Sequence, residues 1–439
     1  MREVTVGICG LGTVGGGVLQ ILSGNAELIA ERAQAPLRVA HVSTRYERKD
    51  LEAQGIAVSR DYRDVIADPT VQILIEAYGG TELAQDILTS ALRAGKQVVT
   101  ANKALIAEHG NALFALAAEH GVSLRFEAAV AGGIPVIKAL REGLAANRIE
   151  WLAGIINGTG NFILSEMRDK ERRFDDVLVE AQALGYAEAD PTFDVEGIDA
   201  AHKLAIMAAI AFGMPLRFDA VYTEGISTLT PEDIAYAGEL GYCIKHLGIA
   251  RNAQQGVELR VHPTLLPADL LLANVHGVKN AIMIAGDSVG PTLYYGDGAG
   301  GSATASAVIA DSIDLARQLS ADQGCTVPAL GVTPTAMRDL PIIPMGEVHT
   351  AWYLRLTALD KPGVMSQVSS ILGGQGISIE ALIQKAPRGG AKQVPVAVIT
   401  NSASQSNLDR AVASIEALDV IVAPVTRIRV ETLDGQRGS

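Results

Sequence analysis

Residues 4–22 read VTVGICGLGTVGGGVLQIL, and the class of fold that we predict rests mainly on this stretch. VTVGIC is apolar enough for a short buried strand, and apolar residues recur at helical spacing after the glycines. Gly10, Gly12 and Gly15 stand in G-x-G-x-x-G register, which allows a tight turn, close approach of a pyrophosphate and close helix–strand packing. We therefore expect a dinucleotide to bind at Gly10, Leu11, Gly12, Thr13, Val14 and Gly15, on a helix N-terminus. A glycine-rich turn without a ligand is the alternative.

The residues that follow alternate between buried strands and helices. VQILIEAYGG and KQVVTANK are typical of strands, and residues 82–94 are typical of a helix. This alternation predicts a parallel, doubly wound α/β sheet. Lys103 follows Asn102 at the carboxyl end of one strand, the edge where such sheets bind ligands. Lys103 is therefore either a ligand-binding residue or an ordinary surface lysine.

The second strand, residues 37–43, is followed by Thr44 and Arg45. NAD-binding chains usually carry a ribose-binding acid near this point, whereas an arginine suits the 2′-phosphate of NADP. Arg45 therefore favours NADP(H) over NAD(H). Glu47 lies near the expected position of a ribose-binding acid, so NAD(H) remains an alternative cofactor. The third alternative is that Arg45 lies on a solvated loop and binds no ligand.

A second informative stretch, YAEADPTFDVEGIDAAHK, covers residues 186–203 and places carboxylates ahead of one lysine. Asp199 and Lys203 are four residues apart, so they share one face of a helix that we expect to end near Gly213. An uncompensated ammonium among apolar residues is costly, and acidic neighbours would keep it charged as a positioned proton donor. The alternative is a solvated acidic loop with an ordinary ion pair.

Two flanking segments complete this picture. Residues 175–184 predict a helix that is capped by Asp175 and ended by Gly185. Residues 151–164 predict a strand, a turn and the start of a helix. In that turn Asn157 and Thr159 are candidates for orienting a small polar substrate or the nicotinamide, and a plain turn is an equal alternative.

The second half of the chain predicts further elements. Strands between residues 257 and 293 suggest a second, more antiparallel sheet. A glycine turn then opens a long helix that we expect to return to the first domain. After a linker rich in Pro, Gly and Met, residues 349–431 follow a βαββαβ pattern. We expect the last residues, 432–439, to be disordered.

The composition excludes several classes of protein. The net charge of −13, without a basic patch, argues against binding to nucleic acid or to an anionic membrane. Three widely spaced cysteines make neither a disulfide framework nor a zinc site. No leader segment or membrane-length apolar run is present, so we expect a cytoplasmic protein.

Together these motifs resemble homoserine dehydrogenase of the monofunctional type that carries an ACT domain. The resemblance covers nearly the whole chain through GLGTVG, TANK, NGT, the block at 185–203, GAGGSATASAVIAD, and DKPGV with GISIEALIQ. The 185–203 block is specific to the family, whereas the first motif is not. Gly160 and Ser302–Ala303 depart mildly from the family's pattern.

The resemblance implies a role for each matching residue. Lys203 would be the proton donor, and Lys103 a second lysine near the carbonyl and the nicotinamide. The substrate would contact Glu188, Asp194, Asp199, Tyr186 and Thr159, and the cofactor would also touch Gly185 and Gly300. The carbonyls of Glu127, Val130, Gly132 and Ile134 would bind sodium.

The resemblance also implies an organisation and an activity. The domains would be a Rossmann-type NAD(P)-binding domain (1–130 with about 304–330), an α+β catalytic and dimerisation domain (131–303), a linker (331–348) and a ferredoxin-like ACT domain (349–431). The activity would be reversible NAD(P)H-dependent reduction of L-aspartate 4-semialdehyde to L-homoserine, in a homodimer or homotetramer. L-Threonine would bind the ACT domain as a regulator.

Two other classes of function remain open on the sequence. One is a nicotinamide oxidoreductase that acts on another amino-acid-derived carbonyl. The other is a non-catalytic amino-acid sensor, which the lysine–carboxylate set disfavours because a sensor needs no lysines at a nicotinamide edge.

Overall fold

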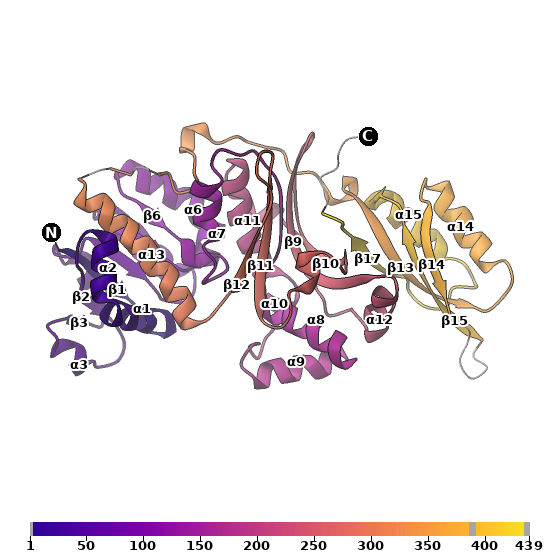
Figure 1. Ribbon diagram of the computed structural model, residues 1–439, viewed down its shortest axis with the longest axis horizontal. Coiled ribbons are helices and arrows are strands. Elements are labelled where there is room, and N and C mark those ends of the chain that lie inside the picture. Colours follow the sequence, from indigo (N-terminus) through magenta and orange to yellow (C-terminus); the bar gives the residue numbers. More distant parts are fainter. Residues whose placement is uncertain (1–2, 323, 326, 386–391, 434–439) are drawn as a thin grey trace. The chain divides into compact units, whose positions relative to one another are not determined.

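The computed structural model describes residues 3–322, 324–325, 327–385 and 392–433. The chain forms two compact units, which are described separately (Figure 1). Unit 1 comprises residues 1–152, 199–221 and 279–340, and unit 2 comprises residues 153–198, 222–278 and 341–439. The predicted tail lies outside the described residues from position 434 onward. No described helix is long and apolar enough to cross a membrane.

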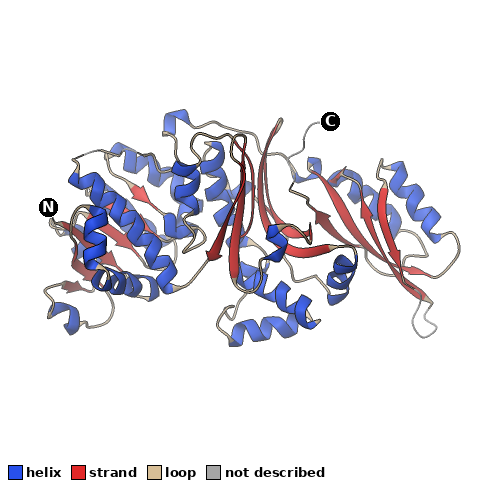
Figure 2. Ribbon diagram, in the orientation of Figure 1, coloured by secondary structure: helices blue, strands red, loops and turns tan. Residues whose placement is uncertain are grey.

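Unit 1 is built on a six-stranded parallel sheet with the strand order β3-β2-β1-β4-β5-β6 (Figures 1 and 2). Its strands are β1 (Val4–Cys9), β2 (Leu37–Ser43), β3 (Ala57–Ser59), β4 (Ile73–Glu76), β5 (Gln97–Thr100) and β6 (Leu124–Arg125). Its helices are α1 (Thr13–Gly24), α2 (Ala26–Ala33), α3 (Lys49–Glu52), α4 (Tyr62–Ala67), α5 (Glu82–Arg93) and α6 (Lys103–Glu119). The strand order reverses between β1 and β4, which is the point where doubly wound sheets bind ligands. The predicted Rossmann-type sheet is confirmed.

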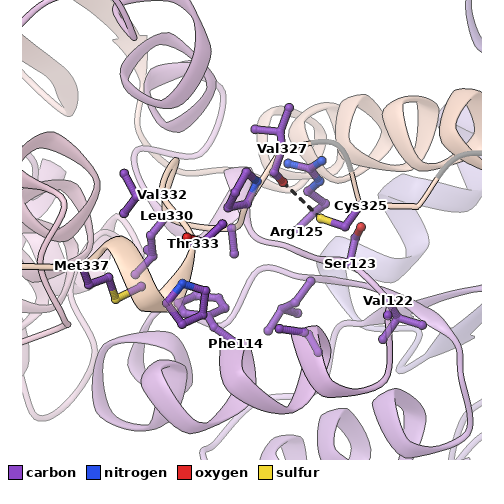
Figure 3. A pocket seen from close by; sticks show the side chains of 17 residues that line it. Phe114, Val122, Ser123, Arg125, Cys325, Val327, Leu330, Val332, Thr333 and Met337 are labelled. Atoms are coloured by element: carbon purple, nitrogen blue, oxygen red, sulfur yellow. Dashed lines mark hydrogen bonds between the residues drawn. The ribbon is translucent and has the colours of Figure 1, made fainter.

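The other elements of unit 1 come from three parts of the chain. They are α7 (Val136–Lys138), a π-helical turn (Ala139–Gly143), α11 (Ile198–Phe212), the antiparallel hairpin of β11 (Lys279–Gly286) and β12 (Gly290–Asp297), and α13 (Gly301–Ser320). One boundary between the units, at residues 152 and 153, falls inside β7 (Ile149–Ile155). Another, at residues 198 and 199, falls after the first residue of α11. The segment after α13 passes close to α6, and the two enclose a cavity (Figure 3).

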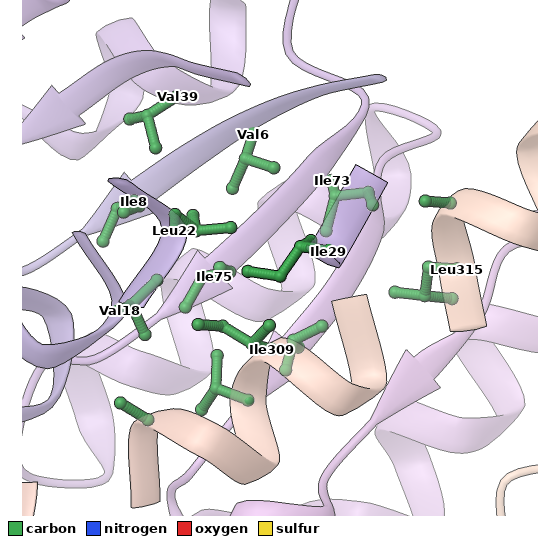
Figure 4. Packing of buried hydrophobic residues seen from close by; sticks show 14 of the residues in the cluster. Val6, Ile8, Val18, Leu22, Ile29, Val39, Ile73, Ile75, Ile309 and Leu315 are labelled. Carbon is green, nitrogen blue, oxygen red and sulfur yellow. The ribbon is translucent and has the colours of Figure 1, made fainter. Parts of the chain in front are cut away.

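The core of unit 1 explains why α13 belongs with the N-terminal strands. Ile309 and Leu315 of α13 are buried against Ile73 and Ile75 of β4 and their neighbours (Figure 4). Each such side chain stabilises the fold by roughly 1.5–3 kcal/mol. At Gly17 of α1 an added Cβ would lie 3.0 Å from the Cβ of Ala305, so small residues allow α1 and α13 to approach closely. The long helix therefore returns to the first domain, as the sequence predicts.

Unit 2 contains a mixed sheet whose strands follow the order β9-β10-β17-β13-β15-β14. β10 pairs antiparallel with β9 and parallel with β17. The strands are β8 (Tyr222–Thr223), β9 (Tyr242–Ala253), β10 (Gly256–Pro267), β13 (His349–Leu359), β14 (Ile379–Gln384), β15 (Gln393–Thr400), β16 (Ala403–Ser404) and β17 (Thr426–Val430). The helices are α8 (Gly158–Lys170), α9 (Phe174–Ala183), α10 (Thr192–Val195), α12 (Pro231–Glu239), α14 (Val364–Gly374) and α15 (Gln405–Glu416).

The C-terminal part of unit 2 has the predicted βαββαβ order, through β13, α14, β14, β15, α15 and β17. Val368 and Leu372 of α14 and Leu408 and Val412 of α15 are buried in one core with the strands. The predicted ferredoxin-like βαββαβ arrangement is therefore confirmed for this part of the chain.

Three local features differ from the sequence analysis. α9 begins at Phe174 after Arg173, so Asp175 lies in its first turn, where a carboxylate favours the helix dipole, and does not cap it. The acid-rich loop contains a short helix, α10. β9 and α12 were not anticipated, although Thr230 and Asp233 form a capping box at the start of α12.

Candidate active site

The glycine turn between β1 and α1 has the geometry that its three glycines predict. Gly10 has a φ of +98°, which favours glycine. A Cβ on Gly15 would lie 2.0 Å from the carbonyl oxygen of Gly10, so only glycine allows this close packing. A Cβ on Gly12 would meet nothing within 4 Å, which leaves the backbone open to a phosphate. The turn therefore fits a dinucleotide.

Two lysines of unit 1 share a single carboxylate. Lys203 Nζ donates to Asp199 Oδ2 at 2.7 Å, and Lys103 Nζ lies 3.1 Å from Asp199 Oδ1. Asp199 and Lys203 are buried on α11, whereas about a third of the Lys103 side chain is exposed. The spacing of four residues positions the first pair, and the second depends on how α6 and α11 pack. The shared carboxylate therefore brings two ammonium groups together, and an ammonium group stabilises a nearby oxyanion.

Lys103 is positioned by the residue before it. Asn102 caps α6, because its Oδ1 accepts the N–H of Leu105 at 3.1 Å while its Nδ2 donates to the carbonyl of Gly80 at 2.7 Å. Lys103 therefore begins the helix directly after β5, at the carboxyl edge of the sheet. The asparagine in the sequence TANK indicates the start of this helix, because asparagine is a favoured N-cap residue.

Glu76 was not anticipated as part of the site. It ends β4 at the switch point, is buried, and accepts hydrogen bonds from the Thr100 hydroxyl at 2.6 Å and from the N–H of Tyr78 at 2.8 Å. Burial raises the pKa of Glu76 to about 7 against the opposing effect of these bonds. The only sequence signal was an acid at the end of an apolar strand.

Arg45 lies exposed beyond the carboxyl end of β2. Beside it Thr44, Tyr46, Glu47, Lys49 and Arg60 line a shallow pocket of about 260 Å³. The strand end, the arginine and the pocket are all compatible with the adenosine part of a dinucleotide. The same pocket is lined by Glu47, an acid that is compatible with NAD(H) as the alternative cofactor.

In unit 2 the residues of the NGT turn contact the acid-rich loop. Asn157 caps α8 by accepting the N–H of Gly160 at 2.7 Å, and it donates to Asp194 Oδ1 at 2.7 Å. The Thr159 hydroxyl donates to the carbonyl of Tyr186 at 2.7 Å. The structure thus brings together Asn157 with Asp194 and Thr159 with Tyr186.

The remaining predicted residues differ in their surroundings. Glu188, Gly185 and Gly300 are exposed, and 44% of Tyr186 is exposed while its ring contacts the edge of Phe162. Gly300 has a φ of +118° and directly precedes α13. These exposed positions are accessible to a ligand.

The predicted sodium ligands lie in one tight loop between β6 and α7. Ala131 and Gly132 both have left-handed φ values, +54° and +47°. The carbonyl of Glu127 accepts the N–H of Val130 at 3.3 Å, and that of Ile134 accepts the N–H of Val136 at 2.7 Å. A carbonyl oxygen has a second lone pair, so these contacts still permit a cation. Among the described residues no cluster of three or more His, Cys, Asp or Glu is arranged around a metal.

Hydride transfer to a carbonyl needs a bound nicotinamide cofactor and a group that neutralises the oxygen that becomes negative. Unit 1 supplies a dinucleotide turn on a Rossmann-type sheet and two ammonium groups that meet at one carboxylate. The fold and the site thus define an NAD(P)-dependent oxidoreductase.

Comparison with known proteins identifies the family. The homoserine dehydrogenase NAD-binding domain matches residues 10–127, the homoserine dehydrogenase domain matches residues 135–313, and the ACT domain matches residues 352–419. A homoserine dehydrogenase of Pseudomonas aeruginosa is 56% identical over 99% of this chain and 100% of its own length, and one of Neisseria gonorrhoeae is 51% identical with the same coverage. The chain belongs to the homoserine dehydrogenase family.

Solved structures agree with this assignment. The crystal structure of a homoserine dehydrogenase from Thiobacillus denitrificans matches with a TM-score of 0.93 at 55% identity over 99% of each chain. A hyperthermophilic archaeal homoserine dehydrogenase in complex with NADPH matches with a TM-score of 0.60 at 26% identity, over 71% of this chain and 97% of that one.

Proposed function

We propose that this chain catalyses the reversible reduction of L-aspartate 4-semialdehyde to L-homoserine with NAD(P)H. The observation that carries the proposal is the Asp199 carboxylate, which lies within hydrogen-bond reach of both Lys203 and Lys103. Full-length relatives named homoserine dehydrogenase support the choice of substrate.

In the proposed mechanism Lys203 is the proton donor. A bound reduced nicotinamide would supply the hydride to the aldehyde carbon, so negative charge would develop on the carbonyl oxygen. Lys203 stabilises this charge and transfers one proton to the oxygen, which completes the alcohol. Asp199 holds the lysine ammonium in one orientation, and Lys103 contributes a second positive charge near the same oxygen. In the direction of oxidation the proton returns to Lys203.

The proposed substrate contacts divide by chemistry. Asp194 and Glu188 offer carboxylates for the substrate ammonium, and Asp199 contributes through the lysines. Asn157 would orient Asp194, because its amide already donates to that carboxylate. Tyr186 and Thr159 would complete the contacts to the small polar substrate.

We propose NADP(H) as the preferred cofactor, held by the backbone of residues 10–15 and by Lys103, Gly185 and Gly300. Arg45 is exposed at the end of β2, where its guanidinium would pair with the 2′-phosphate. The archaeal relative in complex with NADPH supports this preference.

A monovalent cation, sodium, would bind the carbonyls of Glu127, Val130, Gly132 and Ile134. The consecutive left-handed residues in this loop support the assignment, because they turn neighbouring carbonyls away from the regular helical direction. Oxygen ligands of this kind suit hard cations.

We propose that L-threonine regulates the enzyme by binding the ACT domain, residues 349–431. At the start of α14 a pocket of about 250 Å³ is lined by Asp360, Lys361, Gly363, Ser366 and Gln384, among others. Its mixed charges suit the ammonium and the carboxylate of an amino acid. The proposed division of labour has three parts besides the ACT domain. The cofactor would bind residues 1–130 with about 304–330, and catalysis and dimerisation would belong to residues 131–303. Residues 331–348 would link these parts to the ACT domain, and the enzyme would be a homodimer or a homotetramer.

One assay tests these proposals together. Oxidation of NADPH and of NADH is followed by the loss of the reduced-nicotinamide absorbance with L-aspartate 4-semialdehyde, with and without L-threonine. We expect turnover that depends on the aldehyde, is faster with NADPH and is inhibited by threonine. Turnover only with other hydroxy-amino acids, in the reverse direction, would indicate a different substrate. No turnover with either cofactor would favour a non-catalytic sensor.

A further inference from the structure

A cavity of about 230 Å³ in unit 1 lies away from the glycine turn, between α6 and the segment that follows α13. Its walls are mainly apolar and include Phe114, Val122, Leu330 and Met337. Figure 3 shows the Arg125 guanidinium and the Cys325 thiol together on one side of it. An arginine in such a wall is unusual, because a buried guanidinium is costly without partners.

Arg125 is 5% exposed, and within the described part of the chain its Nε and Nη1 have no hydrogen-bond partner. Arg141 is also buried, and its Nη1 likewise has none. The nearby carboxylates are already engaged, since Glu142 pairs with Arg141 at 2.8 Å and Asp311 accepts the N–H of Glu127 at 2.8 Å. Burial and the charge of Arg141 lower the pKa of Arg125. The guanidinium of Arg125 therefore has unused hydrogen-bond donors.

Two polar side chains of the wall donate their hydrogens to other protein groups, and neither accepts from Arg125 Nε or Nη1. The Ser123 hydroxyl donates to Gln318 Oε1 at 3.2 Å, and the Cys325 thiol donates to the carbonyl of Val327 at 3.3 Å. A carboxylate matches the planar donor set of a guanidinium, and an apolar body matches the walls. A cavity of about 150 Å³ accommodates benzene, so this one has room for a ring and a carboxylate.

We propose that this cavity binds a small apolar carboxylate, with its carboxylate on Arg125 and its hydrocarbon part against Phe114 and Leu330. The ligand would be a monoanion with an aromatic or branched aliphatic body. Only Phe126 separates Arg125 from the loop of residues 127–134, so the ligand would bind close to the backbone that carries the proposed cation site.

Benzoate and its neutral analogue benzamide test the proposal on the full chain by isothermal titration calorimetry. We expect benzoate to bind at one site per chain and benzamide to bind at least about ten-fold more weakly, because it lacks the charge-assisted bond. Ala118 lines the cavity from the exposed face of α6, so Ala118→Trp should block benzoate binding. Ala115 is exposed on the same helix but does not line the cavity, so Ala115→Trp is the matched control.

Cys325 supplies an independent readout, because it is exposed whereas Cys9 and Cys243 are buried. Benzoate should slow the alkylation of Cys325 by N-ethylmaleimide and benzamide should not, with Cys325→Ser as the labelling control. Arg125→Met should remove the preference for benzoate, and Arg125→Lys should keep part of it. Equal binding of the two compounds, no saturable binding of benzoate, or binding that survives Ala118→Trp would overturn the proposal.

Discussion

Lys203 Nζ lies 2.7 Å from Asp199 Oδ2, one helical turn earlier on α11, and both side chains are buried. The other oxygen of the same carboxylate lies 3.1 Å from Lys103 Nζ. A carboxylate held between two ammonium groups orients both of them. The first two predictions test what each partner of this arrangement does.

Lys203→Ala removes the proposed proton donor. We expect kcat to fall by about 10²–10⁴-fold, the usual contribution of a positioned acid, while the Kd for NADPH stays within about two-fold because the variant leaves the glycine turn intact. Steady-state kinetics and cofactor titration measure the two quantities. Lys170→Ala is the control, since Lys170 also pairs with an acid four residues earlier but on an exposed part of α8. Unchanged turnover would reject Lys203 as the donor.

Asp199→Asn replaces the shared carboxylate by an amide of similar shape. Both lysines then lose the carboxylate that orients them, so we expect kcat to fall by about ten-fold or more and the free energy of unfolding to fall by about 1–3 kcal/mol. Kinetics and denaturant titration provide the measurements. A variant that loses stability but retains kcat would show that Asp199 is structural only.

Gly15→Ala places a methyl group 2.0 Å from the carbonyl oxygen of Gly10. The turn must then shift, and we expect both cofactor affinity and thermal stability to decrease. Gly16→Ala is the control, because a Cβ there meets nothing within 4 Å and alanine stabilises a helix by roughly 0.5–1 kcal/mol relative to glycine. Cofactor binding and melting temperature should therefore separate the two variants, and equal effects would contradict the close-packing argument.

Arg45→Ala tests the cofactor preference. Loss of a charge-assisted bond to the 2′-phosphate should raise KM for NADPH by about ten-fold or more and leave KM for NADH nearly unchanged. Arg48 lies on the same loop but pairs with Asp50 at 2.7 Å, so Arg48→Ala is the matched control. If KM rises equally for NADPH and NADH, Arg45 does not contact the 2′-phosphate.

Glu76 makes stability depend on pH with a definite sign. Its pKa is raised by burial from 4.5 to about 7, so between these pH values the folded chain binds more protons than the unfolded chain. Stability from this group is therefore present at low pH and falls as pH rises through that window. Glu76→Gln keeps the side chain neutral. We expect its stability relative to the parent to increase from pH 5 to pH 8 by on the order of 3 kcal/mol.

Thermal unfolding of the variant and of the parent across this pH range measures the difference in their stability. Other buried acids, such as Glu127 and Asp311, are present in both chains, so their contributions cancel in this difference. Glu27→Gln, at an exposed position on α2, is the control and should show no such trend. A pH-independent difference between Glu76→Gln and the parent would show that the Glu76 carboxyl does not titrate in this window.

Much of the fold could be predicted from the sequence because its signals are local. β1 and β2 have the bounds that the apolar runs predict, and α11 ends at Phe212, directly before Gly213. The capped start of α9 was wrong, because a carboxylate in the first turn and one at the cap look alike in a sequence. β9 was not anticipated, although its apolar residues pair along the whole length of β10.

The strand–turn–helix at residues 4–22 and the pairing of Asp199 with Lys203 could both be predicted from the sequence alone. Both follow from spacing within a few residues, which local backbone geometry converts directly into contacts. The packing of distant elements was needed to show that Lys103 meets the same carboxylate, that Glu76 is buried, and that Arg125 lines an apolar cavity. These relationships join residues far apart in the chain, and they depend on how the packed helices and strands exclude water around each charged group.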